Sequence, residues 1–395
     1  MADRMRFGIF MAPFHAPARQ SPTAAYARDV ATVQQLDELG YDEAWFGEHH
    51  SCGTEIIPAP DIFIAHVASR TRHIRLGTGV LSLPYHNPLW VADRMIFLDH
   101  LTHGRSMMGL GPGALPTDAA MIGIDPSEQR GALEHDVDVL MHLLTNDEPI
   151  SVETSRYRLV EARCQLRPFS HPCFEVGVAA IASPAGPRIA GKHGLSLLSV
   201  GATMQGEAGL DLLALHWDVM EKRAQEFGQV PDRSGWRLVG PMHIAETREQ
   251  ACKDVEWGID AWFDYLQKVA AAPQFHPLGD TLEERIAWVN DSGVGVIGTP
   301  DDAIRQIRRL EEQSGGFGAY LMMAHEWARP AAIQRHYELF AQYVIPEFQG
   351  SAARLERSKA WAQNRWGELN TKQSDAIAAW TEKHQSEGLA TEAKP

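Results

Sequence analysis

The chain has 395 residues, enough for one large α/β domain or two smaller domains. Its hydrophobic fraction of 44% and charged fraction of 22% are ordinary for a globular protein, and its formal net charge of -15 argues against a nucleic acid as partner, because phosphates bind to basic surfaces. The four cysteines include no C-x-x-C pair, so we expect reduced thiols in a cytoplasmic protein, without a zinc site or a disulfide framework. No apolar run approaches the ~20 residues needed to cross a bilayer, so we expect no membrane association.

Predicted strands and helices alternate along the chain. The first strand is predicted at residues 5–13, and a helix follows at 21–40, with a serine cap, a proline in its first turn and a glycine at its end. The second strand begins at Glu43 and ends abruptly in Glu48-His49-His50. Six more strands are predicted at residues 73–84, 106–113, 173–182, 195–201, 236–245 and 318–326. Further helices are predicted at 87–101, 127–144, 186–193, 206–227 and 330–348, and from Thr247 and Thr299.

This alternation favours an α/β fold in which residues 1–350 form a (β/α)8 TIM barrel. A doubly wound open sheet is the alternative, but no G-x-G-x-x-G follows the first strand. Two segments interrupt the pattern. Residues 145–173 are an insertion with the character of a hairpin, and residues 273–298 are a second insertion, either a lid or a surface loop without a role. Residues 351–395 are polar with spaced tryptophans; they predict a helical extension that packs on the barrel or on a second subunit, with a disordered end at 386–395.

In such a barrel, function resides where the strands end. Glu48-His49-His50 ends the second strand there, and the question is whether it binds a metal ion or moves protons. Neighbouring residues of a strand point to opposite faces, so His49 and His50 would not bind one ion together, and we predict no metal site. A histidine can instead supply or remove a proton near neutral pH, and Glu48 can orient a histidine. The alternative for His49 is a buried structural histidine.

Two further motifs suggest a bound ligand. Ser183, Ala185 and Gly186 lie where a helix starts, and free N–H groups there can hold a phosphate, although a plain helix cap explains the same residues. Gly111 and Gly113 end the fourth strand, where glycine allows a flat group to approach the backbone or simply makes a tight turn.

Several motifs together resemble the bacterial luciferase-like flavin-dependent monooxygenases. They are "FGIF", "GYDEAWFGEHH", "IRLGTGVLSLPYHNP", "LDHLTHGRSMMGLGPG", "IASPAGPRIAGKHG" and "GTPDDAIRQI", in the family's order over residues 5–347. The stretch "GPGALPTDAAMIGIDP" is especially similar to the limonene monooxygenase-like members.

The resemblance implies an enzyme that takes reduced FMN from a separate NAD(P)H-dependent flavin reductase. It would use O2 to oxygenate a small apolar substrate such as a terpene, through a C4a-(hydro)peroxyflavin. It also implies a homodimer that pairs through helices beside the first strands. A minority of relatives use F420, so an F420-dependent oxidoreductase stays open, and so does a non-catalytic flavin-binding protein.

The resemblance also implies roles for particular residues. His49 matches the family's catalytic histidine, and Thr78, His86 and Asn87 match positions near the flavin ring. Gly111 stands where the luciferase has a reactive cysteine, and Pro112 replaces an arginine near the flavin phosphate. Phosphate binding therefore rests more on the turn after the fifth strand. The predicted cofactor-binding set is Thr78, His86, Asn87, Gly111, Gly113, Ser183, Ala185 and Gly186. The predicted substrate pocket is Phe14, Trp45, Met323, His325 and Trp327, each of which is more often a core residue.

Overall fold

The protein was studied as a computed structural model that describes residues 4–12, 14–15, 20–204, 211–270 and 280–392. The chain divides into two compact units, residues 1–348 and 349–395. No helix in the described part of the chain is long and apolar enough to span a membrane.

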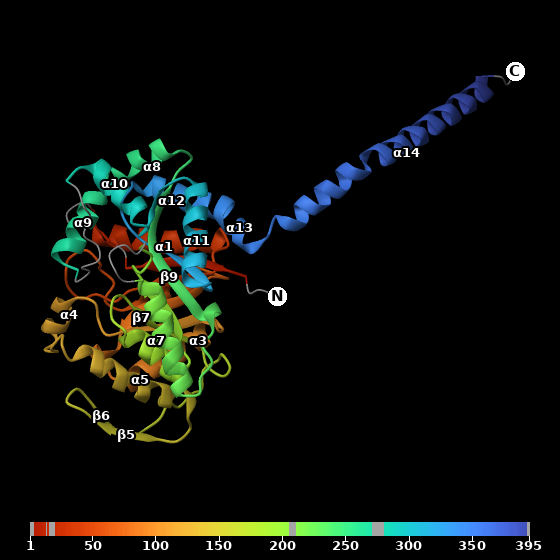
Figure 1. The fold of residues 1–395 in the computed structure, drawn as a ribbon. Coiled ribbons are helices and arrows are strands. Elements are labelled where there is room, and N and C mark those ends of the chain that lie inside the picture. The colour runs from red at the N-terminus through yellow and green to blue at the C-terminus, as the bar shows by residue number, and fades with distance from the viewer. Residues whose placement is uncertain (1–3, 13, 16–19, 205–210, 271–279, 393–395) are drawn as a thin grey trace. The chain divides into compact units, whose positions relative to one another are not determined.

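Eight parallel strands close into a barrel in the first unit (Figure 1). The strand β11 pairs with both β1 and β9, and β9 pairs with β8. These pairings join the two ends of the sheet, so the eight strands form a closed ring. The predicted TIM barrel is therefore confirmed, and the doubly wound sheet is excluded. The barrel strands are β1 (Arg6–Met11), β2 (Glu43–Phe46), β3 (Arg75–Ser82), β4 (Ser106–Gly111), β7 (Glu175–Ala180), β8 (Ser196–Val200), β9 (Trp236–Ile244) and β11 (Ala319–Met323).

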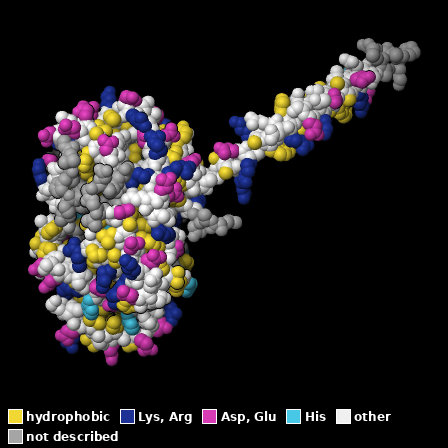
Figure 2. Space-filling model, in the orientation of Figure 1, with side chains coloured by type: hydrophobic (Ala, Val, Ile, Leu, Met, Phe, Trp, Pro, Cys, Tyr) yellow, Lys and Arg dark blue, Asp and Glu magenta, His cyan; other side chains and the backbone are white. Residues whose placement is uncertain are grey.

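Helices surround the barrel, and their exposed faces carry interspersed acidic and basic side chains (Figure 2). The helices that the sequence predicts are α1 (Pro22–Glu38), α3 (Pro88–Thr102), α5 (Gln129–Thr145), α6 (Ala185–His193), α7 (Leu212–Glu226), α8 (Arg248–Val255), α11 (Pro300–Ser314) and α12 (Pro330–Leu339). Residues 205–210, at the start of the helix predicted at 206–227, lie outside the described residues. Within the described residues, four helices were not predicted: α2 (Pro60–Ala68), α4 (Pro116–Met121), α9 (Ile259–Lys268) and α10 (Leu282–Asp291).

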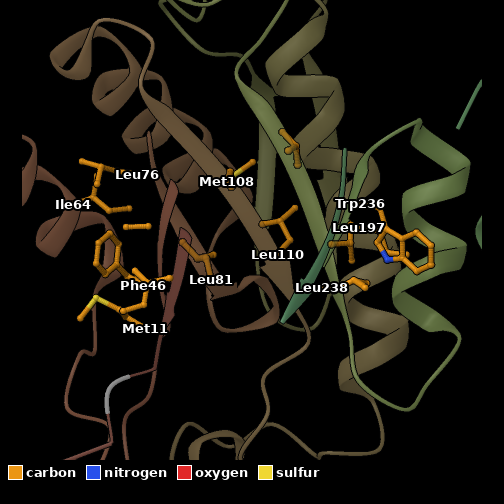
Figure 3. Packing of buried hydrophobic residues seen from close by; sticks show 14 of the residues in the cluster. Met11, Phe46, Ile64, Leu76, Leu81, Met108, Leu110, Leu197, Trp236 and Leu238 are labelled. Carbon is orange, nitrogen blue, oxygen red and sulfur yellow. The ribbon is translucent and has the colours of Figure 1, made fainter. Parts of the chain in front are cut away.

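Most of the core lies between the barrel strands and the helices outside them. Figure 3 shows Met11, Phe46 and Leu76 from the first three strands near Ile64 of α2, all of them buried. A smaller cluster fills the barrel itself and consists of Phe10, Trp45, Met107, Leu198, Val239 and Leu321. A side chain buried in this way contributes about 1.5–3 kcal/mol to the free energy of unfolding.

Buried charges close the amino end of the barrel. Glu43 is fully buried, and its carboxylate accepts hydrogen bonds from Arg237 at 2.7 and 2.9 Å and from the Trp45 indole at 2.9 Å. Arg237 also forms an ion pair with Glu175 at 2.7 Å. Burial raises the pKa of Glu43, but Arg237 outweighs this effect and holds it below its usual value. Because each charge here has a partner, the network can lie in the core and anchor the starts of the strands.

The two insertions differ in structure. Residues 150–162 form the antiparallel hairpin of β5 (Ile150–Glu153) and β6 (Arg158–Ala162). The second insertion is not the long loop that we expected. Residues 273–279 lie outside the described residues, and the rest forms α10 and a short strand, β10 (Val296–Gly298), which pairs with β9. A capping box of Thr281 and Glu284 starts α10, and this signal was present in the sequence.

The described part of the second unit consists mainly of the helix α14 (Ala353–Glu392). The helix extends through Glu392, whereas we expected disorder from residue 386 onward. Residues 386–392 include alanine, glutamate and leucine, which favour helix and extend a helix that has already formed. Residues 393–395 lie outside the described residues.

Candidate active site

A cavity of about 160 Å³ lies at the carboxyl end of the barrel strands. Its walls come from the ends of β1, β2, β3, β7, β8 and β11 and from α9, which contributes Trp262, Tyr265 and Leu266. The other described residues of the lining are Phe10, Ala12, Glu48, His49, Glu55, Gly79, Val80, Ser82, Ala114, Leu115, Ala179, Ile181, Val200, Ala270, Met323 and Ala324. The wall is largely apolar, and its acidic and basic side chains, Glu48, His49 and Glu55, follow β2, where the sequence predicted the site.

His49 lies in the cavity wall between two carboxylates. Its Nε2 atom forms an ion pair with Glu55 Oε2 at 2.7 Å, and its Nδ1 atom is 3.3 Å from Asp118 Oδ2. Burial lowers the pKa of His49, but the two carboxylates outweigh burial and raise it to about 10. The imidazole is therefore protonated at neutral pH. This differs from our expectation of a proton exchanged near neutral pH, which took no account of two acidic partners.

Glu48 bonds to two histidines, His50 and His86, and so connects the loops around His49. The Glu48 side chain accepts hydrogen bonds from the His50 and His86 rings at 2.9 and 2.7 Å, and from the Ser82 backbone N–H at 2.7 Å. Burial raises the pKa of Glu48, but these hydrogen bonds outweigh it and lower the pKa. An ionised Glu48 thus ties the end of β2 to the end of β3 beside the cavity.

The predicted ring-binding residues near β3 lie close to the cavity but are largely engaged elsewhere. Thr78 is buried, and its hydroxyl donates to the Gly109 carbonyl oxygen at 2.8 Å and accepts from the Gly109 N–H at 3.0 Å. Asn87 caps α3 by accepting a hydrogen bond from the Leu89 N–H at 3.0 Å. His86 does not line the described cavity but is hydrogen-bonded to Glu48, which does. None of these three side chains is among the described residues that line the cavity.

The predicted glycines are explained by packing. A Cβ atom at Gly111 would lie 2.5 Å from the Val80 side chain, and Val80 itself lines the cavity. A Cβ atom at Gly113, which has a φ of +96°, would lie 2.1 Å from the Tyr85 hydroxyl. Because they lack a side chain, the two glycines allow β3 and the turn after it to pack closely against the end of β4.

The turn after β7 lies near the cavity, which Ala179 and Ile181 line. Ser183 and Ala185 are partly exposed, and the Ala185 N–H donates to the Ser183 hydroxyl at 3.2 Å. Gly186 is buried, and a Cβ atom there would lie 2.2 Å from the Ala179 carbonyl oxygen. Gly186 thus permits close packing of α6 on β7, while Ser183 and Ala185 stay accessible at the start of the helix.

Of the predicted substrate pocket, Met323 lines the cavity. Trp45 is fully buried inside the barrel, and a Cβ atom at Gly77 or Gly79 would lie 2.6 or 2.7 Å from its side chain. The other three are not among the described residues of the lining. Phe14 and Trp327 belong to the buried cluster directly behind it, which also contains Trp262 and Tyr265 of α9. Phe14 packs against Tyr265, His325 stacks on Trp327, and Trp327 contacts Trp262.

Sequence reasoning missed three residues of the site. Asp118 comes from α4 and Glu55 from the loop after β2, and these are the acidic partners of His49. Tyr265 comes from the unpredicted helix α9; burial and hydrogen bonds to Glu55 and Cys52 raise its pKa. The only sequence signal was helical spacing of apolar residues, Ile259, Trp262, Phe263 and Leu266, in α9. Among the described residues, no group of three or more His, Cys, Asp or Glu side chains is arranged to hold a metal ion.

The family model for luciferase-like monooxygenases matches residues 5–316. The chain belongs to the luciferase-like monooxygenase family. It is 45% identical over 347 residues to limonene 1,2-monooxygenase of Rhodococcus erythropolis, a match that covers 88% of this chain and 87% of the relative. It is 40% identical over 361 residues to 4-hydroxyprotoasukamycin monooxygenase of Streptomyces nodosus subsp. asukaensis, covering 91% of this chain and 96% of that protein. The family resemblance seen in the sequence is confirmed.

Solved structures share the fold of this luciferase-like monooxygenase. One is the oxygenating constituent of 3,6-diketocamphane monooxygenase from Pseudomonas putida in complex with FMN, with a TM-score of 0.71 and 24% identity, covering 87% of this chain and 98% of that chain. An F420-dependent secondary alcohol dehydrogenase matches with a TM-score of 0.63 and 15% identity, covering 86% of this chain and 98% of that chain. At these identities both likenesses establish the barrel fold, and the choice of cofactor is a separate question.

Proposed function

We propose that the chain is the oxygenase component of a two-component monooxygenase. It takes reduced FMN from a separate NAD(P)H-dependent flavin reductase and uses O2 to oxygenate a small apolar substrate such as a terpene. The observation that carries the proposal is the largely apolar cavity at the barrel mouth with one charged imidazole, that of His49, in its wall. The high identity to two monooxygenases, one of which is named for limonene, supports it.

The residues around the cavity fit a flavin. Small residues in the lining, Ala12, Gly79 and Ala179, leave room for a planar ring, and the accessible start of α6 at Ser183 and Ala185 suits a phosphate. When bound, reduced FMN would supply the electrons that activate O2. The role of the protein in the reaction would be to keep water out of the cavity, and Trp262 and Leu266 of α9 contribute large apolar side chains to its wall.

His49 has a specific part in this proposal. Asp118 holds its Nδ1 atom, which leaves Nε2 and its partner Glu55 as the pair that lines the cavity. Because the pKa of His49 is about 10, the imidazolium can donate from Nε2 but does not accept a proton at neutral pH. A bound group that takes the Nε2 hydrogen bond would displace Glu55, while Asp118 keeps the ring in place.

A homodimer is part of the proposal. Trp90, Phe97 and Leu101 lie on one face of α3, and with Ile62 of α2 they leave large apolar side chains exposed by 53–70%. Monomeric proteins seldom leave such a cluster in water, so a second copy of the chain would cover it.

The test uses the purified chain with limonene as probe. Reduced FMN is mixed in without oxygen, ¹⁸O2 is then admitted, and products are analysed by gas chromatography and mass spectrometry. We expect one ¹⁸O atom in the product and a fall of about 100-fold or more for His49→Asn, which is typical for loss of a catalytic proton donor. The control is His103→Asn on the exposed end of α3, where the φ of +52° suits asparagine, and it should keep full turnover.

Other outcomes would contradict the proposal. Hydride transfer with reduced F420 but no oxygen incorporation with FMN would indicate an F420-dependent oxidoreductase. Tight binding of oxidised FMN without turnover of limonene or of a panel of small ketones and alkenes would indicate a non-catalytic flavin-binding protein.

A further inference from the structure

The helix α14 carries a stripe of large exposed apolar side chains along one face. Leu355, Trp366 and Ile377 follow one another at intervals of 11 residues, and so do Leu369 and Trp380. Eleven residues make three helical turns, so these side chains share one face. Their exposed fractions range from 41% for Leu369 to 72% for Leu355, and Figure 2 shows yellow side chains along the helix.

The stripe is self-complementary. Trp366 and Trp380 each lie seven residues from Gln373, and Leu369 and Ile377 each lie four residues from it. Two antiparallel copies related by a two-fold axis at Gln373 would therefore place Trp366 opposite Trp380 and Leu369 opposite Ile377. This is the relation that an isologous dimer interface requires. Gln373 would meet its own copy, and a polar residue inside an apolar seam fixes the register of paired helices.

The charge along α14 favours the same orientation. Residues 353–370 contain four basic and two acidic side chains, whereas residues 371–388 contain two basic and three acidic ones. Antiparallel pairing sets the basic half of one helix against the acidic half of the other and opposes the two helix dipoles. A buried tryptophan contributes about 150–250 Å², so four of them with the aliphatic residues reach on the order of 1,200 Å², the lower bound of a stable interface.

We propose that α14 is a self-association helix, which pairs antiparallel with α14 of a second copy of this chain. The exposed Trp361 does not belong to the stripe, since it lies on another face of the helix, and it provides a matched control. The proposal concerns the second unit alone and does not depend on the reaction in the barrel.

The first test is disulfide trapping in the full-length chain. Under mild oxidation, Gln373→Cys should give a disulfide-linked dimer, whereas Asn364→Cys, on the opposite face of the helix, should not. The wild-type chain measures the background from its four half-buried native cysteines. Adding Trp366→Ala and Trp380→Ala to Gln373→Cys should reduce cross-linking at least 10-fold, while adding Trp361→Ala should leave it unchanged. Alanine keeps the helix, which circular dichroism can verify.

The second test fixes the orientation. A Leu369→Cys chain with a size tag is mixed with an untagged Ile377→Cys chain and oxidised. The antiparallel pair should give the mixed disulfide, whereas a parallel pair would give each variant linked to itself, which would overturn the proposal. It would also be overturned if Gln373→Cys failed to cross-link or if both faces cross-linked equally; the stripe would then pack on its own barrel or on another protein.

Discussion

Asp118→Asn should lower the pKa of His49 without unfolding the site. The Asp118 carboxylate contacts His49 Nδ1, accepts the His50 backbone N–H at 3.1 Å and accepts a short hydrogen bond from Ser51. Asparagine has nearly the same shape and keeps one oxygen as acceptor, but it removes the negative charge. Glu55 alone would then stabilise the imidazolium.

The magnitude follows from the contacts. A hydrogen bond to a charged group contributes about 1.5–3 kcal/mol, and one pKa unit corresponds to about 1.4 kcal/mol. The pKa of His49, about 10 in the native protein, should therefore fall by roughly one to two units in the variant. His49 would still be protonated at pH 7, so the mutation would weaken its positioning more than its charge.

The assay is NMR of protein with isotope-labelled histidine, recorded as a function of pH. The His49 ring signal is identified by its loss in His49→Asn. The matched control is Asp125→Asn, an exposed residue whose side chain accepts hydrogen bonds from Ser127 at 2.7 and 2.8 Å and has no contact with His49. The reasoning would be refuted if Asp118→Asn left the titration of His49 unchanged, or if Asp125→Asn shifted it equally.

Three further predictions concern stability. Arg237→Met leaves a buried carboxylate without its main partner and should cost about 3–5 kcal/mol in urea unfolding. Arg335→Met, at an exposed ion pair, should leave the urea midpoint almost unchanged. Equal losses of stability would contradict the assigned role of the buried network. Gly186→Ala should lower the thermal midpoint, because the added Cβ atom would collide with the backbone carbonyl of Ala179. Gly131→Ala, in open space on α5, should raise stability by about 0.5–1 kcal/mol. The opposite order of stabilities would refute the packing argument. Folding raises the pKa of His49 from 6.5 to about 10, so the contribution of its charge to stability is complete below pH 6.5 and is lost as pH rises through 10. The unfolding free energy should therefore decline less steeply over this pH window in His49→Asn than in the wild-type chain. An identical decline in both would contradict the role given to the His49 charge.

Much of the fold could be predicted from local patterns. The order of strands and helices needs only the spacing of apolar residues and the turn residues between them, and parallel strands joined by helices leave few architectures. The motif after the second strand predicted residues that line the cavity, Glu48 and His49, because barrel strands all end on the same side. The helices α2 and α4 were not predicted because they are too short to show a clear helical spacing of apolar residues. The prolines beside them favour loops and turns.

The sequence by itself determined the barrel, the family and the position of His49 at the cavity where the barrel strands end. Only the tertiary structure decided what state that histidine is in, since Glu55 and Asp118 approach it from segments that no local pattern connects to it. The same holds for the surroundings of Trp45 and Gly186: their residue types are compatible with a ligand site, and only the structure shows how closely their neighbours in space pack on them. Protonation and burial depend on distances between segments remote in the chain, and these exist only once the barrel has closed.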